Sequence, residues 1–466
     1  MMYAANPLNP PFASRCRQAL VFLWLVAAAA GISGCRKYLE VKPDKKLVVP
    51  GQLQDAQALL DNFSTLNGSY PSLGAQSDDD FYLLPAYYNA INITNRNNYV
   101  WAPEAMNNNE WNSLYRMVLV ANVALETLEK APPAAFEREN WNRTRGTAFF
   151  FRAQAFYHLA QYYAPPYEKG KAESLPGIPL RLNSNGNVAS TRSSLEATYR
   201  QVIQDLQEAA TLLPPAVSLL SRPSKAAAFG ALARTYLLME DYSEARRFAD
   251  SCLHRHPTLI DYNTLNAAAT VPFTRYNPEV IFHSVLLGTG MLGVNNWRVD
   301  SLLYRSYAAD DLRRTLFFRS NGSGTFGFRG SYDGTVTANH FNGIAADEIY
   351  LIRAECHARL GALTPALEDL NTLLEKRWRT GSFVPLTAAT ADEALLKILE
   401  ERRKELVLRS TRWIDLRRLN KEPRFQKTLV RQIDNNTYSL PPGDPRYTFL
   451  IPQVVIELSG IQQNPR

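Results

Sequence analysis

The chain has 466 residues, of which 46% are hydrophobic, and its 51 basic and 44 acidic side chains give a formal net charge of +7 at pH 7. This charge is mild and mixed along the sequence, whereas nucleic-acid-binding proteins normally concentrate basic residues on one face, so we expect no nucleic-acid partner. The length and hydrophobic content are sufficient for a large buried core.

The N-terminus has the pattern of a bacterial lipoprotein signal peptide. Arg15 and Arg17 precede an apolar run of 14 residues, which is too short to span a hydrocarbon core of about 30 Å. Small residues then lead to Cys35, whose thiol would carry the lipid that anchors the chain. We expect residues 1–34 to be removed and residues 35–51 to form a lipidated tether. The alternative is an ordinary secretory leader with a chance cysteine beside its cleavage site.

An N-terminal helical region is expected over residues 52–257. It begins with a helix at 52–62 and continues with a long helix at 109–130, and a loop insertion at 63–109 separates the two. The insertion lacks helical periodicity and is rich in aromatic and turn residues.

Aromatic and acidic residues of this insertion are candidates for ligand binding, because flat rings stack on sugars or peptide groups and carboxylates accept hydrogen bonds from hydroxyls. We single out Tyr70, Asp79, Tyr82, Tyr87 and Tyr88. The alternative is that these rings pack the loop onto the helices. The acidic run 78–80 could also hold calcium, but it lacks the spacing of an EF-hand, so we expect no metal and no cofactor.

A tetratricopeptide-like repeat is clearest at 226–257. Ala233 and Ala245 fall where small residues let two helices approach closely, and Pro257 falls where the second helix must end. The segment 149–163 is similar to the first helix of another unit, and its partner at 194–213 is delayed by a proline-rich loop. The sequence therefore predicts a mainly all-α superhelix of helical repeats, with long irregular insertions and a few short strands.

A second irregular insertion is expected at 258–343, where Trp297, Tyr304 and Tyr332 complete the set of candidate ligand-binding residues. The segment 322–327 satisfies the GxGxxG pattern, but more glycines follow it instead of a helix, so we interpret it as a hairpin or loop and not as a phosphate site.

The C-terminal region, 344–466, begins with a second copy of the repeat at 347–378. A further helix is expected at 391–409, opened by a capping box of Thr390 and Glu393. The dense charges at 400–418 are interpreted as paired side chains that clamp the last helix to the repeats.

Cys252 and Cys356 fall in helical patterns and are expected to be buried small hydrophobes, although the sequence leaves a disulfide between them open.

Several separated segments carry a resemblance to the SusD/RagB family of outer-membrane lipoproteins of Bacteroidetes. These segments are 35–43, 111–115, 121–122, 279–282, 401–406, 412–418, 451–453 and 463–465. The chain departs from the family pattern at Arg409 and Ser410, where the family usually has Glu-Gly, and at Val455, where an acidic residue is common.

The resemblance implies a helical protein that packs against a TonB-dependent transporter of the SusC type and acts as its lid. Such a protein captures an oligosaccharide or peptide at the cell surface and delivers it to the transporter without catalysis. A lipid anchor on Cys35 would hold it in the outer membrane.

Two other classes of function stay open. A glycan-active hydrolase would need two carboxylates about 5 to 10 Å apart, and the insertions offer Asp78, Asp79, Asp80, Asp310 and Asp311. We identify no catalytic residue among them. A repeat adaptor of the cell envelope would keep the helices and bind no small ligand.

Overall fold

The computed structural model describes residues 1–2, 50–293 and 295–466. The lipidation site Cys35 and nearly all of the signal peptide (1–34) and of the tether (35–51) therefore lie outside the described residues. No helix in the described ranges is both long enough and apolar enough to span a membrane.

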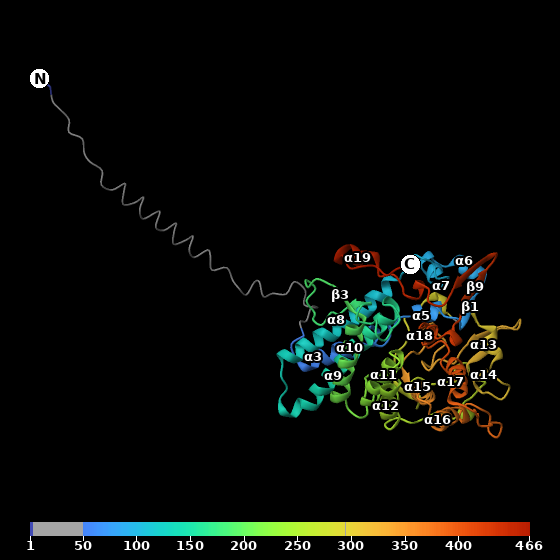
Figure 1. Cartoon of the computed structure of the whole chain (residues 1–466). Coiled ribbons are helices and arrows are strands. Elements are labelled where there is room, and N and C mark those ends of the chain that lie inside the picture. The colour runs from blue at the N-terminus through green and yellow to red at the C-terminus, as the bar shows by residue number, and fades with distance from the viewer. Residues whose placement is uncertain (3–49, 294) are drawn as a thin grey trace. The chain divides into compact units, whose positions relative to one another are not determined.

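Long helices form the body of the protein and pack one after another along the chain (Figure 1). They are α8 (Asn108–Lys130), α9 (Arg138–Tyr163), α10 (Leu195–Leu212), α11 (Lys225–Leu238), α12 (Tyr242–Leu253), α15 (Ala346–Arg359), α16 (Leu363–Glu375) and α17 (Ala391–Glu405). The pairs α9 with α10, α11 with α12 and α15 with α16 are the predicted repeat units, and α12 packs on α15. The predicted all-α repeat fold is confirmed.

Short polar side chains start several of these helices, as their sequence suggests. The side chain of Asn107 accepts hydrogen bonds from the first turn of α8, and Ser194 and Asp241 cap α10 and α12 in the same way. Thr390 caps α17 by accepting from the backbone N–H of Glu393. Cys252 and Cys356 are buried and free, so the two do not form a disulfide.

The predicted first helix is α3 (Leu53–Leu60), but the insertion at 63–109 is not a loop throughout. It contains four short helices, namely α4 (Phe63–Leu66), α5 (Leu73–Ser77), α6 (Pro85–Ala90) and α7 (Ile93–Tyr99). Other short helices follow later in the chain, namely α13 (Ser301–Arg305), α14 (Arg313–Leu316), α18 (Arg412–Leu419) and α19 (Gln453–Ser459).

The strands of the described chain form small antiparallel pairs. They are β1 (Phe81–Leu83) with β5 (Trp297–Val299), β2 (Pro176–Pro179) with β3 (Arg192–Ser194), β4 (Val280–Phe282) with β8 (Ile344–Ala345), β6 (Phe318–Ser320) with β7 (Phe326–Phe328), and β9 (Leu429–Ile433) with β10 (Asn436–Leu440). The glycine-rich segment 322–327 connects β6 to β7 and runs into β7, as expected for a hairpin. The pair β1–β5 joins the two insertions to each other.

The two insertions share a hydrophobic core that is distinct from the core of the repeats. Rings from both, including Phe81, Tyr99, Trp297, Phe317 and Tyr332, are buried together in it. The insertions thus fold into a body that is set on the repeats. Many of their aromatic residues form the core of this body.

Candidate functional site

A cavity of about 200 Å³ lies where the first insertion meets the hairpin β9–β10. We call it the candidate ligand pocket. It is lined by Asp78, Asp79, Phe81, Tyr82, Leu83, Tyr99, Trp101, Asp300, Leu429, Val430, Arg431 and Gln432. Three segments that are far apart in the sequence therefore build it.

Rings fixed by hydrogen bonds underlie this pocket. The Trp101 indole donates to the carbonyl of Ser77 (2.9 Å), and the Tyr99 hydroxyl accepts from the backbone N–H of Leu83 (2.8 Å). The guanidinium of Arg431 lies 3.6 Å from the centroid of the Tyr99 ring, a cation–π contact. Tyr82 is only half-buried, on β1, so it is the ring of the pocket that remains available to a ligand.

Asp79 is held by three cations. Its carboxylate oxygens lie 2.6 Å from Nε of Arg412, 3.2 Å from an Arg403 nitrogen and 2.5 Å from Nζ of Lys427. Burial raises the pKa of Asp79, but these cations outweigh that effect and hold the pKa well below its ordinary value. Asp79 lines the pocket, and its charge is already compensated within the protein, which disfavours a calcium ion there.

The neighbouring carboxyl groups of Asp78 and Asp80 differ, because nearby cations do not outweigh the effect of burial on their pKa values. Burial raises the pKa of Asp78 well above its ordinary value, and the adjacent Asp80 and Asp79 add to the rise. Burial raises the pKa of Asp80 to about 6, against the attraction of Arg403. The carboxylate of Asp300 is one-third exposed, so it is the acidic group of the pocket best placed to accept hydrogen bonds from a ligand.

Other predicted ligand residues lie in the core. Tyr70, Trp297 and Tyr332 are at most 1% exposed, and Tyr88 is 8% exposed against the ring of Tyr99. Trp297 meets Phe81 edge to face in the shared core of the insertions. Tyr70 lies instead in the core of the repeats, edge to face with His158 of α9. None of the four rings offers an open face to a ligand in this structure.

Two more predicted residues lie outside the pocket. Tyr304 stacks on Phe326 with ring centroids 3.5 Å apart, and the guanidinium of Arg314 lies 5.2 Å from the Tyr304 centroid. Tyr87 is half-buried on α6. Neither residue lines the candidate ligand pocket.

The hairpin β9–β10 contributes to the pocket, which was not predicted from the sequence. The alternating burial along β9 and the turn at Asp434, which has a φ of +51°, are ordinary signals of a hairpin. The side chain of Asn89 on α6 donates to Asp434 (3.1 Å), so the hairpin is tied to the first insertion.

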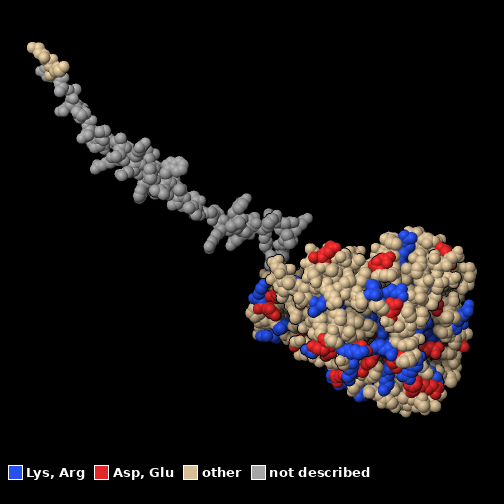
Figure 2. Space-filling model, turned by 45° about the horizontal axis from the view of Figure 1, so that its top comes forward, with Lys and Arg blue, Asp and Glu red and all other residues tan. Residues whose placement is uncertain are grey.

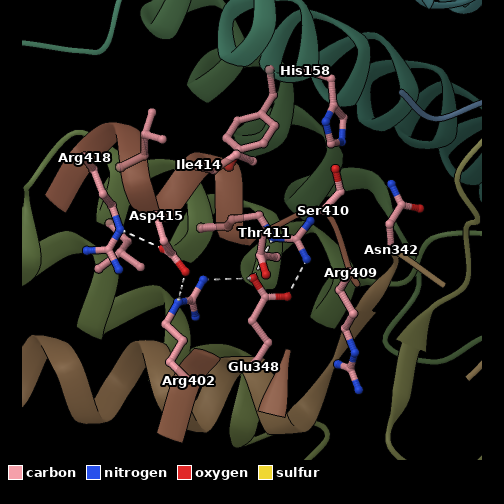
Figure 3. A pocket seen from close by; sticks show the side chains of 14 residues that line it. His158, Asn342, Glu348, Arg402, Arg409, Ser410, Thr411, Ile414, Asp415 and Arg418 are labelled. Carbon is pink, nitrogen blue, oxygen red and sulfur yellow. Dashed lines mark hydrogen bonds and ion pairs between the residues drawn. The ribbon is translucent and has the colours of Figure 1, made fainter. Parts of the chain in front are cut away.

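A dense group of charges lies elsewhere, in a small cavity between α9, α11, α15, α17 and α18 (Figure 3). Arg234 binds Glu348 at 2.9 Å, and Asp415 lies 2.8 Å from Arg402 and 2.9 Å from Arg418. The cavity holds about 20 Å³, which is room for a single water molecule and not for a sugar ring. Together with the burial of Trp413 and Leu416, these pairs confirm that the charged segment 400–418 is a structural clamp.

Three buried carboxylates, Glu279, Asp347 and Glu405, have oxygens within 4.8 Å of one another, which is compatible with a metal site. Arginines already balance them, however. Arg377 lies 2.8 Å from both Glu279 and Glu405, and Arg409 lies 2.7 Å from Asp347. We assign no metal to this cluster.

Charged side chains of both signs alternate on the face seen in Figure 2, and neither sign dominates a broad area of it. This distribution is unlike the concentrated basic face of a nucleic-acid-binding protein.

Comparison with known proteins identifies the family. Residues 37–237 match a family described as "Starch-binding associating with outer membrane", and residues 346–449 match the SusD family. The chain belongs to the SusD/RagB family. Among curated proteins, it is similar to SusD-like protein P2 of Formosa agariphila, with 24% identity over 373 residues that cover 66% of this chain and 71% of the relative.

Solved structures share the fold. A SusD superfamily protein from Bacteroides thetaiotaomicron has a TM-score of 0.74 at 22% identity and matches over 89% of this chain and 100% of its own. A putative sugar binding protein from Bacteroides vulgatus has a TM-score of 0.73 at 19% identity, over 90% and 99% of the two chains. A laminarin binding SusD-like protein has a TM-score of 0.64 at 17% identity, over 88% and 97%.

Proposed function

We propose that this protein is a nutrient-binding lipoprotein of the outer membrane. It captures a carbohydrate in the candidate ligand pocket and delivers it to a partner TonB-dependent transporter of the SusC type, for which it acts as a lid. Membership of the SusD/RagB family supports this role, as does the description of the family as starch-binding and associated with the outer membrane.

The composition of the candidate ligand pocket supports a carbohydrate as the ligand. It combines the half-buried ring of Tyr82 with the partly exposed carboxylate of Asp300 and the exposed amide of Gln432. An aromatic face beside hydrogen-bond acceptors and donors suits the C–H faces and hydroxyls of a sugar. The laminarin-binding relative supports a glucan as the first ligand to test.

Binding without turnover is consistent with the pairing and burial of the aspartates that were candidates for catalysis. Asp79 and Asp311 are paired with arginine, Asp78 and Asp80 are at most 1% exposed, and Asp310 pairs with Arg379 at the surface. A glycosidase needs one carboxylic acid and one carboxylate facing each other across an accessible cleft. We therefore propose that the protein is not an enzyme.

The test is a titration of the purified protein with laminarin, other glucans and peptides, with affinity and reaction products measured together. We expect saturable binding of a glucan and no products. The Tyr82→Ala variant should lose roughly 1 to 3 kcal/mol of binding free energy, by analogy with stacking platforms for bases. Tyr350→Ala, which removes a half-buried ring from α15, is the matched control and should bind normally.

Other outcomes would contradict the proposal in distinct ways. Product formation would indicate the hydrolase, and saturable binding of peptides alone would move the ligand class from glycans to peptides. No binding to any glucan or peptide of the panel would indicate a repeat adaptor of the cell envelope. Equal affinity of the Tyr82→Ala and wild-type proteins would remove this pocket from the binding site.

The membrane attachment and the transporter need separate tests. We expect radiolabelled palmitate to be incorporated by the wild type and not by Cys35→Ala. We also expect the protein to co-purify with a large β-barrel from solubilised outer membranes and to be cleaved by protease added to intact cells. Repeated failure to recover a barrel would count against the lid role, and resistance to protease in intact cells would contradict a cell-surface orientation.

A further inference from the structure

A second and larger cavity, of about 330 Å³, lies where the loop after α9 meets α18 and the C-terminal segment. We call it the proline-lined pocket. Its apolar wall includes Pro165, Pro166, Leu175, Pro176, Pro445 and Pro465. It has no lining residue in common with the candidate ligand pocket.

The polar side of this pocket contains Arg417, on α18, which is 4% exposed. Its guanidinium donates to the carbonyls of Gln161 and Ala164 at the C-terminal end of α9, the second at 2.5 Å. Its buried Nε has no hydrogen-bond partner in the part of the chain that the structure describes. The neighbouring Arg418, in contrast, binds two carboxylates.

The end of α9 compensates this charge only in part, because a helix C-terminus is equivalent to about half a negative charge. A buried ion that lacks a partner of full charge is destabilising, because its lost hydration is not replaced. In agreement with this imbalance, burial lowers the pKa of Arg417 to about 10.

Nearby ionic groups do not supply the missing charge. Lys421 pairs with Glu240, and Asp444 pairs with Arg446 at 2.7 Å, so these pairs are neutral. Arg192, whose Nε donates to the carbonyl of Gly177, also has no carboxylate within ion-pair distance among the described residues. The pocket therefore combines an apolar wall with an excess of positive charge.

We propose that the proline-lined pocket binds a ligand with an apolar body and a carboxylate, the carboxylate lying beside Arg417. The apolar wall excludes water, which strengthens the pairing of the two charges. The same chemistry occurs in a free organic acid and in the C-terminus of a peptide with apolar side chains. The site is independent of the proposed glucan binding.

The first test uses crystals of the protein soaked with 4-bromobenzoate and, separately, with its neutral isostere 4-bromobenzamide. We expect an anomalous bromine peak in the proline-lined pocket with the acid alone. Equal occupancy by the amide would overturn the proposal, because it would show an apolar pocket indifferent to charge. No peak in the pocket, or binding at crystal concentration only, would overturn it as well.

The second test is in solution and leaves Arg417 in place, because removing it would also remove the cap of α9. We expect 4-bromobenzoate to raise the melting temperature saturably in the wild type. Leu175→Trp, which fills the pocket, should abolish this shift, and Leu182→Trp, at a 46% exposed position outside the pocket, should retain it. An equal shift in both variants would place the binding elsewhere and overturn the proposal.

A further arm compares N-acetyl-Leu-Leu with its C-terminal amide to separate the two sources. Binding of this acid, but not of its amide, would assign the site to peptide C-termini. Binding of 4-bromobenzoate alone would assign it to free organic acids, and binding of neither acid would overturn the proposal.

Discussion

Trp297 shows that a ring in an aromatic-rich insertion can belong to the core. It lies on β5, is fully buried, and packs against Phe81 with centroids 5.4 Å apart. Truncating a buried tryptophan removes these contacts and leaves a cavity, so we expect Trp297→Ala to lower the free energy of unfolding by about 3 to 5 kcal/mol. Denaturant unfolding measures this loss. A variant of unchanged stability that has lost its ligand would contradict the placement of Trp297 in the core.

Glu110 predicts a pH dependence. Its buried carboxylate accepts from the Ser72 hydroxyl (2.7 Å) and the Leu73 N–H (3.0 Å), and burial raises its pKa to about 7. The unfolded chain has the ordinary value of about 4.3, so the native state binds this proton more tightly. The contribution of Glu110 to stability is therefore fully present below pH 4 and is lost as the pH rises towards 7, by roughly 3 kcal/mol in all.

We expect Glu110→Gln to remove this loss. Between pH 5 and 8, the free energy of unfolding of the variant should fall less steeply than that of the wild type, as measured by urea titration at each pH. Equal slopes in the two proteins would show that Glu110 titrates normally.

At the scale of elements, α5 is fixed by its close approach to α18. A Cβ placed on Gly74 would lie 2.9 Å from Oγ of Ser410 and 3.1 Å from Cβ of Trp413, both of which are buried. Gly74→Ala must push α5 away from α18, and we expect a loss of about 1 to 3 kcal/mol in stability. Because Asp78 follows α5 directly, ligand affinity should fall as well. Gly186→Ala, which meets nothing within 4 Å, is the control.

The repeat helices could be predicted from sequence because their signals are local. Small residues, caps and a terminating proline within one stretch of about 30 residues define each unit. The short helices α4 to α7 have only four to seven residues each, which is too short for a repeating hydrophobic pattern, although Asn62 caps α4 and Asn92 caps α7. Their stability comes from distant segments, as the contact of α5 with α18 shows.

Contacts between distant segments also account for what was missed at the candidate site. Asp79 and Tyr82 were predicted from their insertion, but the cations that bind Asp79 come from residues more than 300 positions away. Burial of Tyr70 and Trp297 likewise depends on distant segments, since Tyr70 meets His158 of α9 and Trp297 meets Phe81 of the first insertion. Ser410, where the family usually has glycine, has a φ of +61°, and its hydroxyl lies 3.0 Å from the Tyr162 hydroxyl, a partner that the sequence does not reveal.

At the scale of the whole molecule, buried ion pairs connect regions that the sequence separates. Arg377, after α16, bridges Glu279 of the second insertion and Glu405 at the end of α17. Glu405 in turn binds Arg313 of that insertion at 2.9 Å. The insertion and the C-terminal repeats therefore share one network, and we expect them to unfold together.

Arg377 and Arg379 allow a matched test of this network. Arg377 is fully buried, so Arg377→Met leaves Glu279 and Glu405 without a common partner, and we expect a loss of about 3 to 5 kcal/mol in the free energy of unfolding. Arg379 pairs with Asp310 while its side chain is 64% exposed, so Arg379→Met should cost at most about 1 kcal/mol. Guanidinium unfolding followed by fluorescence and by circular dichroism measures both. Equal losses in the two variants would contradict a network that depends on burial, because only Arg377 is shielded from water.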